Sequence, residues 1–266
     1  MNSVAIVGVG LIGGSFGLAL RNAGFTGSIL GVSSARSIDP AVARGAIDRG
    51  VALDEAAASC DVLFLSQPIS GILETLRRLD PLVRPDTLVT DAGSTKQAIV
   101  DEARRSLHRC AFVGGHPMAG KEVRGVSEAD ATLFRGRPWI LTSEIDHPLR
   151  KWIAAIGARE IILDPVTHDR LVAWGSHLPQ LASTALSSVI SERQPDAARI
   201  AGPGLLDTTR LAMGSYDLWR DILETNAVEI SAALDAYIEK LQNLRGNFEA
   251  EFEKAGRFAR SLRDRV

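Results

Sequence analysis

The sequence predicts an α/β N-terminal domain with a mainly parallel sheet over residues 1–164, and an all-helical C-terminal domain over residues 165–266. Before residue 165, short β-branched apolar runs alternate with helix-like segments, which is typical of βαβ units. The runs are apolar at nearly every position, as in strands covered on both faces. After residue 165 they stop. The strand-like runs occupy 4–10, 28–33, 61–68, 87–94, 110–115, 139–142 and 159–164.

The C-terminal segment carries an apolar stripe with helical spacing, which Gly246 interrupts. A stripe of this length favours pairing with a second copy of the chain, so we expect a homodimer formed through the C-terminal helices. The alternative is a helix that packs only within its own chain. The stripe consists of Ile230, Leu234, Tyr237, Leu241, Leu244, Phe248 and Phe252.

The composition argues against several classes of partner. The formal net charge is −2 and no block of like charge occurs, so we expect a small-molecule partner and no nucleic acid or membrane. Two cysteines, Cys60 and Cys110, lack metal-ligand spacing, so no metal site is expected. The N-terminus has no basic segment and its apolar run is too short for a signal peptide, which predicts a cytoplasmic protein.

A glycine motif, GVGLIG at 8–13, follows the first strand-like run and opens a helix. In that context it is the dinucleotide fingerprint of a Rossmann-like domain. Gly8 is expected to make the tight turn, Gly10 to let the pyrophosphate approach the backbone, and Gly13 to allow close packing of the helix on the strand. The phosphates are expected at the positive end of the helix. The alternative is a tight turn alone. The expected cofactor contacts are Gly8, Gly10, Leu11, Ile12 and Gly13.

The end of the second strand-like run indicates which dinucleotide binds. NAD sites carry an acidic residue about 20 positions beyond the glycines, and Ser33 occupies that position here. The hydroxyls and guanidinium of Ser33, Ser34, Arg36 and Ser37 suit a 2′-phosphate, so NADP is favoured. NAD remains possible if Arg36 is solvated and Asp39 turns toward the ribose.

Three strand ends are expected to converge on one crevice, because open α/β sheets bind ligands at the carboxyl ends of their strands. Gln67 and Pro68 end one run, DAGSTK at 91–96 ends another, and VGGHPMAGKE at 113–122 ends the third. Ser94 is expected either to donate to the nicotinamide or substrate, or to N-cap the next helix, or both. Lys96 is either part of this crevice or a solvated lysine.

His116 stands among small residues and before Pro117. An imidazole with a pKa of about 6.5 accepts a proton at neutral pH, so His116 is the expected base for oxidation of an alcohol. Gly114 and Gly115 are expected to leave space in front of it. The alternative is a histidine that is merely hydrogen-bonded in the core.

Seven motifs together carry a family resemblance, and the specific part is GGHPMAG followed by SHLP. The chain resembles the prephenate and arogenate dehydrogenases of tyrosine biosynthesis over nearly its whole length. The resemblance implies NAD(P)-dependent oxidative decarboxylation of prephenate or arogenate, in a cleft between a Rossmann-like and a helical dimerisation domain. The motifs are GVGLIGGS (8–15), DAGSTK (91–96), GGHPMAGKE (114–122), LFRGRPWILT (133–142), THD (167–169), SHLPQ (176–180) and DTTRLA (207–212).

The resemblance also implies roles for single residues. It makes His116 the base for the hydroxyl on ring C4, from which hydride leaves, and Ser94 a partner of the same hydroxyl. Arg210 resembles the arginine that grips a substrate carboxylate. His168 and Asp169 match the pattern, and we expect them to be structural, at the domain junction. The other expected substrate contacts are His177, Glu122, Gln180 and Asp207.

Two departures from the family pattern concern the substrate side chain. Gln180 stands where a second histidine is expected, and Leu206 replaces an arginine. The choice between the keto side chain of prephenate and the amino side chain of arogenate is therefore open. The other functional hypotheses are an imino-acid or β-hydroxyacid reductase and a non-catalytic NADP-binding sensor.

Overall fold

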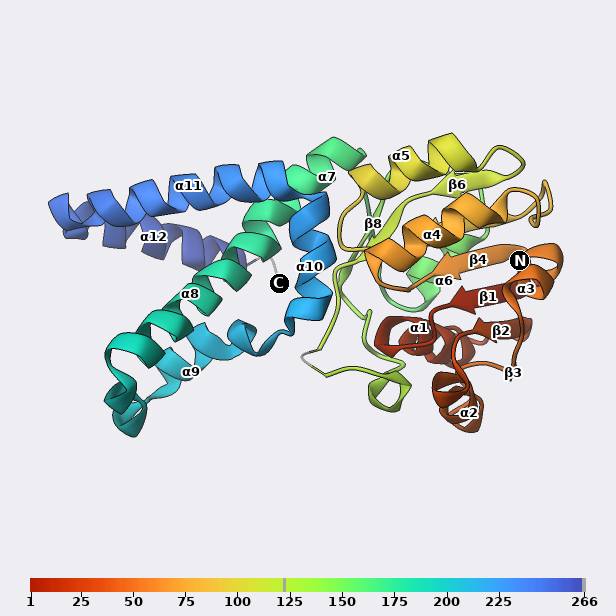
Figure 1. Cartoon of the computed structure of the whole chain (residues 1–266), viewed down its shortest axis with the longest axis horizontal. Helices are drawn as coiled ribbons and strands as arrows, with labels where there is room; N and C mark the ends of the chain where they lie inside the picture. The colour runs from red at the N-terminus through yellow and green to blue at the C-terminus, as the bar shows by residue number, and fades with distance from the viewer. Residues whose placement is uncertain (122, 265–266) are drawn as a thin grey trace.

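The computed structural model describes residues 1–121 and 123–264. It confirms the predicted class, with a parallel-sheet N-terminal domain and a helical C-terminal domain side by side (Figure 1). No helix in these two stretches is long and apolar enough to cross a membrane.

The main sheet has six strands in the order β3-β2-β1-β4-β5-β6, and every neighbouring pair is parallel. This is the strand order of a doubly wound dinucleotide fold, whose crevice opens where the order reverses, between β1 and β4. The two-residue β3 has no apolar run and was not expected from the sequence. The strands are β1 (Ser3–Val7), β2 (Ser28–Val32), β3 (Arg49–Gly50), β4 (Val62–Leu65), β5 (Leu88–Asp91) and β6 (Ala111–Val113).

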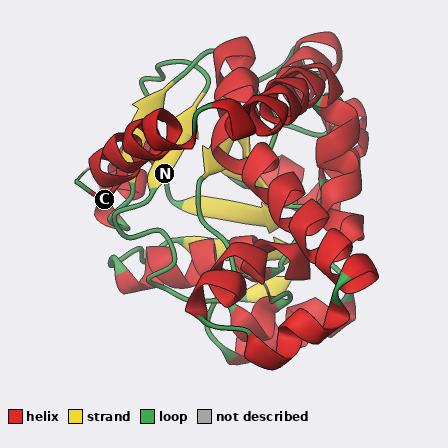
Figure 2. Ribbon diagram, turned by 90° about the vertical axis from the view of Figure 1, so that its left-hand side faces the viewer, coloured by secondary structure: helices red, strands yellow, loops and turns green. Residues whose placement is uncertain are grey.

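Helices cover both faces of this sheet, so its strands are apolar at successive positions. In β1, Val4 and Ile6 pack with α1, α2 and α6, whereas Ala5 and Val7 pack with α3, α4 and α5. Figure 2 shows the strands lying among the helices. The helices are α1 (Leu11–Asn22), α2 (Ala35–Ala43), α3 (Leu53–Ser59), α4 (Ile69–Leu79), α5 (Gln97–Ser106) and α6 (Leu149–Ala155).

A second, three-stranded sheet contains β7 (Gly115–Pro117), β8 (Pro138–Leu141) and β9 (Arg159–Ile162). β7 pairs antiparallel with β8, and β8 pairs parallel with β9. The single strand expected over 110–115 is therefore wrong, because the chain leaves the first sheet after β6 and joins the second at Gly115. His116 lies inside a strand rather than in a loop that follows one.

The C-terminal region is helical throughout its described part, and its helices form a layer beside the N-terminal domain (Figure 1). The apolar stripe does not form one continuous helix, because α11 ends before Gly246 and α12 runs back beside it, tied by Lys240 Nζ to Glu251 Oε1 at 2.9 Å. The elements are α7 (Pro165–Val172), a π-helical turn (Ala173–His177), α8 (Leu178–Arg193), α9 (Pro203–Thr209), α10 (Tyr216–Thr225), α11 (Ala227–Asn243) and α12 (Phe248–Arg263), with 3-10 turns at Val126–Glu128 in the N-terminal domain and at Pro195–Ile200, Arg210–Met213 and Leu244–Gly246.

Candidate active site

The glycine turn lies at the point where the strand order of the main sheet reverses. Gly8 has a φ of 98°, and a Cβ built on it would come within 2.7 Å of the Gln67 backbone nitrogen. A Cβ on Gly13 would lie 2.4 Å from the Gly8 carbonyl oxygen, so both glycines serve close packing. A Cβ on Gly10, by contrast, meets nothing within 4 Å. Open space thus faces the N-terminus of α1, whose first two residues are Leu11 and Ile12. This space fits a pyrophosphate.

The end of β2 carries the residues expected to hold the ribose. Ser33, Ser34 and Arg36 are exposed there, Ser37 is half-buried, and Asp39 lies farther along in α2. Across the crevice, Gln67 Oε1 accepts a hydrogen bond from Thr75 Oγ1 at 2.9 Å, and Pro68 immediately precedes α4. The hydroxyls and the guanidinium at β2 fit a 2′-phosphate.

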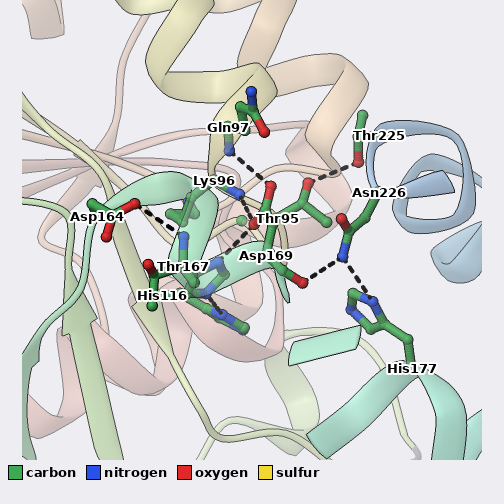
Figure 3. A network of polar contacts seen from close by, with 12 residues as sticks. Thr95, Lys96, Gln97, His116, Asp164, Thr167, Asp169, His177, Thr225 and Asn226 are labelled. Atoms are coloured by element: carbon green, nitrogen blue, oxygen red, sulfur yellow. Dashed lines mark hydrogen bonds and ion pairs between the residues drawn. The ribbon is translucent and has the colours of Figure 1, made fainter. Parts of the chain in front are cut away.

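His116 is the first member of a buried chain of hydrogen bonds that joins the two domains. Its Nδ1 lies 2.8 Å from His168 Nε2, and His168 Nδ1 lies 2.7 Å from Asp169 Oδ1. Only 9 % of His116 is exposed, and His168 is fully buried. His116 comes from β7, and its two partners come from α7 (Figure 3).

The chain fixes the tautomer of each imidazole. An ionised carboxylate only accepts hydrogen bonds, so His168 carries a proton on Nδ1, and in its neutral form it accepts at Nε2. His116 must then donate from Nδ1, which leaves the lone pair of its Nε2 unprotonated. That nitrogen makes no hydrogen bond to any residue in 1–121 or 123–264, so it is available to a ligand.

Burial keeps His116 uncharged. It lowers the pKa of His116 well below the ordinary 6.5, and the neighbouring His168, Lys96 and His177 lower that pKa further. Burial likewise lowers the pKa of His177 to about 4, although Asp169 opposes this shift. Both imidazoles are therefore neutral near pH 7.

An ion pair with no solvent exposure lies behind His116. Lys96 Nζ contacts the carboxylate of Asp91 and donates to the Gly115 carbonyl oxygen at 2.8 Å, while Gly115 N donates to Asp91 Oδ1 at 3.0 Å. The pair therefore holds both backbone polar groups of the residue before His116. Burial lowers the pKa of Lys96, and Asp91 opposes that shift. The interpretation of Lys96 as a solvated lysine is wrong.

Asp169 connects this pair with the histidine chain. Its carboxylate accepts from Lys96 N at 2.7 Å and from Gln97 N at 2.9 Å, so it caps the first turn of α5 from the other domain (Figure 3). Ser94 is consequently not the N-cap of this helix. It lies half-buried in the β5–α5 loop, where its hydroxyl makes no hydrogen bond to a described residue and can meet a ligand.

The glycines before His116 serve packing rather than open space. A Cβ on Gly115 would lie 2.4 Å from the Asp91 carbonyl oxygen, and one on Gly114 would lie 2.8 Å from the Thr142 side chain. A larger residue would push β7 away from β5. The expectation that these glycines clear room for a ligand is therefore wrong.

His177 lies on the π-helical turn that precedes Pro179. The wider turn accommodates the proline, and π-turns are frequent at functional sites. His177 is 1 % exposed, its Nδ1 lies 3.3 Å from Asn226 Nδ2, and its ring stacks edge-on against Trp219. Asn226 Nδ2 also donates to the Asp169 carbonyl oxygen at 2.8 Å, so His177 is tied to the same junction.

The remaining expected substrate contacts lie around the 3-10 turn that begins at Arg210. Gln180 is buried and donates from Nε2 to the Leu211 carbonyl oxygen at 2.7 Å, which fixes that turn. Arg210 lines an open cleft beside the segment that follows β7. Asp207 is exposed on α9. Glu122 lies outside the described residues.

Sequence reasoning missed four members of this site. Asp91 and Asn226 received no role, Lys96 was left open, and Asp169, like its neighbour His168, was expected to be only structural. The adjacency of His168 and Asp169 is the one local signal that could have suggested an imidazole held by a carboxylate. Asn226 requires knowledge of how the helices of the C-terminal domain pack, and Asp91 and Lys96 require knowledge of how β7 lies beside β5.

Comparison with known proteins identifies both domains. Residues 16–158 match the family of the prephenate dehydrogenase nucleotide-binding domain, and residues 164–264 match the prephenate dehydrogenase dimerization domain. Prephenate dehydrogenase of Lactococcus lactis is 34% identical over 255 residues, which cover 94% of this chain and 70% of the relative.

Two solved structures are similar over nearly the whole chain. Prephenate dehydrogenase from A. aeolicus, in complex with hydroxyphenyl propionate and NAD+, has a TM-score of 0.86 and 30% identity, covering 99% of this chain and 96% of its own. Arogenate dehydrogenase of Synechocystis has a TM-score of 0.79 and 30% identity, covering 98% and 99%. The two matched domains follow each other along the chain, and the similar proteins include enzymes named for prephenate and for arogenate. The chain therefore belongs to the prephenate dehydrogenase family.

Proposed function

We propose that this protein is a nicotinamide-dependent oxidoreductase that decarboxylates prephenate, arogenate or both to 4-hydroxyphenylpyruvate or tyrosine, with His116 as the base. The observation that carries the proposal is the buried chain from His116 Nδ1 through His168 to the Asp169 carboxylate at the junction of the two domains, which leaves His116 Nε2 without a hydrogen-bond partner among the described residues. Family membership supplies the substrate class. A binding-only protein would not need an imidazole held in one tautomer.

The nicotinamide, when bound, supplies the acceptor for the hydride that leaves ring C4. His116 Nε2 takes up the proton of the C4 hydroxyl, and loss of CO₂ then leaves an aromatic phenolate. The phenol forms when His116 returns the proton to this oxygen. Because Nδ1 already donates to His168, the charge that develops on His116 is shared along a chain that ends at the Asp169 carboxylate. Ser94 is positioned in the β5–α5 loop to orient the same hydroxyl, and Arg210 and His177 hold the substrate.

The direct test is turnover of prephenate or arogenate with NADP or NAD, followed by absorbance of the reduced nicotinamide and release of CO₂. We expect turnover with at least one of these pairs. Absence of turnover with all of them would remove the proposal and favour a sensor that only binds the cofactor.

The acid limb of kcat/KM should lie below pH 6.5, the ordinary value for histidine. The base works only when it is unprotonated, so activity is complete above its pKa and is lost as the pH falls through it. Because burial and the neighbouring His168, Lys96 and His177 lower this pKa, the limb shifts toward acid. A profile of kcat/KM against pH measures it, and a limb above pH 6.5 would contradict the neutral, buried imidazole.

We further propose that NADP is the preferred cofactor, with NAD as the alternative. Ser33→Asp should shift the ratio of kcat/KM values toward NAD by about tenfold or more, because a carboxylate beside the 2′-phosphate is repulsive. Steady-state kinetics with each cofactor measure the ratio. An unchanged NADP preference would place the ribose pocket elsewhere.

We propose that the chain acts as a homodimer through its helical domain. Support comes from the matched dimerization domain and from large apolar side chains left exposed on α11 and α12, such as Phe252 at 73% and Val228 at 80%. Sedimentation of the intact chain at the mass of a monomer would contradict it.

A further inference from the structure

A strongly basic cleft adjoins the proposed catalytic strand. The cleft has a volume of about 570 Å³, and one wall is the segment Met118–Gly120, which directly follows β7. Met118 is two residues beyond His116 and therefore within about 7 Å of it along the chain. The distance from the cleft to His116, the proposed base, is thus no longer than one substrate molecule. Its charged lining residues are Lys121, Asp130, Arg135, Arg137 and Arg210.

Cations outnumber carboxylates among these lining residues. Asp130 is the one carboxylate among the described lining residues, and it is already paired with Lys121 at 3.0 Å and also accepts hydrogen bonds from Thr132. Arg135 and Arg137 are exposed and form no ion pair with any residue in the described parts of the chain. Their charges are therefore not compensated locally, so the cleft attracts an anion.

The turn that carries the two arginines is firmly held. Gly136 N donates to the Gly157 carbonyl oxygen at 2.8 Å, and Arg159 N donates to the Arg137 carbonyl oxygen at 2.8 Å. Phe134 is buried against Trp139, with ring centroids 5.2 Å apart. The stem of Arg135 lies against Gly157, where an added Cβ would meet it at 3.2 Å. The backbone therefore presents both guanidinium groups from a fixed position.

We propose that this cleft receives the side chain of the substrate, and that Arg135 and Arg137 select a keto-acid side chain over an amino-acid side chain. The inference rests on the proposed function and names its preferred substrate, prephenate. Both side chains carry a carboxylate, which the cleft attracts. The arogenate side chain also carries an ammonium group, which uncompensated guanidinium groups repel, whereas the ketone of prephenate is neutral.

Gln180, which the sequence suggested as the determinant of this choice, is committed elsewhere. Its amide donates to the backbone of the turn that begins at Arg210, so it supports that turn. The charge of the cleft is the stronger discriminator, because it acts on the one group by which the two substrates differ.

The test compares kcat/KM for prephenate and arogenate in the wild type and in Arg135→Gln and Arg137→Gln. We expect the wild type to favour prephenate, and each variant to lower the prephenate-to-arogenate ratio about tenfold, or about 1.4 kcal/mol. The preference should also weaken as ionic strength rises, because the arginines are exposed. Arg78→Gln, an exposed arginine on α4, is the matched control and should leave the ratio unchanged.

The outcomes separate the two levels of the proposal. A wild type that turns over arogenate better, or variants that slow both substrates equally, would overturn the inference and leave the proposed function intact. If the wild type turns over neither substrate, the proposed function fails, and calorimetry with 4-hydroxyphenylpyruvate and tyrosine tests the cleft by itself. Tighter binding of the keto acid, lost in Arg137→Gln, would support the inference, and equal binding of both ligands would overturn it.

Discussion

Replacing His116 with asparagine should lower kcat by roughly 10²–10⁴-fold, the usual range for loss of a general base. Asparagine retains a polar group that can contact His168 but has no nitrogen that takes up a proton at neutral pH. The dinucleotide turn is on other strands, so the affinity for the cofactor should change little. Stopped-flow or steady-state kinetics measure kcat, and fluorescence titration measures cofactor binding.

His108→Asn is the matched control, because His108 is exposed and lies away from the junction. This variant should keep wild-type turnover. The acid limb of kcat/KM should disappear in His116→Asn and remain in the control. A His116→Asn enzyme with turnover near that of the wild type would show that another group accepts the proton.

Lys96→Met should destabilise the fold by about 3–5 kcal/mol, because it leaves the Asp91 carboxylate buried without its cation. For a chain of this size that corresponds to a fall in Tm of roughly 6–20 °C. Turnover at low temperature should fall as well, because the pair holds the backbone of Gly115 and thereby the position of His116. Differential scanning calorimetry measures the Tm.

Two further variants serve as controls for the fall in Tm of Lys96→Met. The double variant Asp91→Asn with Lys96→Met carries no unpaired charge and should regain most of the lost Tm. Lys151→Met removes an exposed lysine from α6 and should leave the Tm within the error of the measurement. If Lys96→Met melts like the wild type, the pair does not contribute to the fold as its burial indicates.

The parts of the fold that depend on local pattern were predictable. The dinucleotide turn was predictable because GVGLIG follows the first strand and a tight turn requires glycine. The covering of the sheet on both faces was predictable because its strand runs are apolar at successive positions. The strand switch at Gly114 was not predictable, because nothing in the run 110–115 marks the residue at which the chain changes from one sheet to the other. The end of α11 was anticipated only as a weakness at Gly246, and the reversal of direction depends on how α12 packs.

The site was predictable where one residue type carries the chemistry. His116 was identified because it stands alone among small residues. Lys96 was not identified, because a lysine at the start of a helix is usually solvated. Its burial is favourable only because its ammonium group contacts the Asp91 carboxylate and the Gly115 carbonyl oxygen. The link from His168 to His116 spans 52 positions in the sequence, and no local pattern encodes it.

The carboxylate of Asp169 has a consequence for how this protein could be recombined. It belongs to the helical half, yet it caps α5 in the nucleotide-binding half and orients the histidine pair that crosses the junction. Neither half is thus a self-sufficient module. A chimera that joins the nucleotide-binding half of one relative to the helical half of another would inherit the proposed proton acceptor from one parent and the residues that orient it from the other. The two halves must therefore be compatible at this junction.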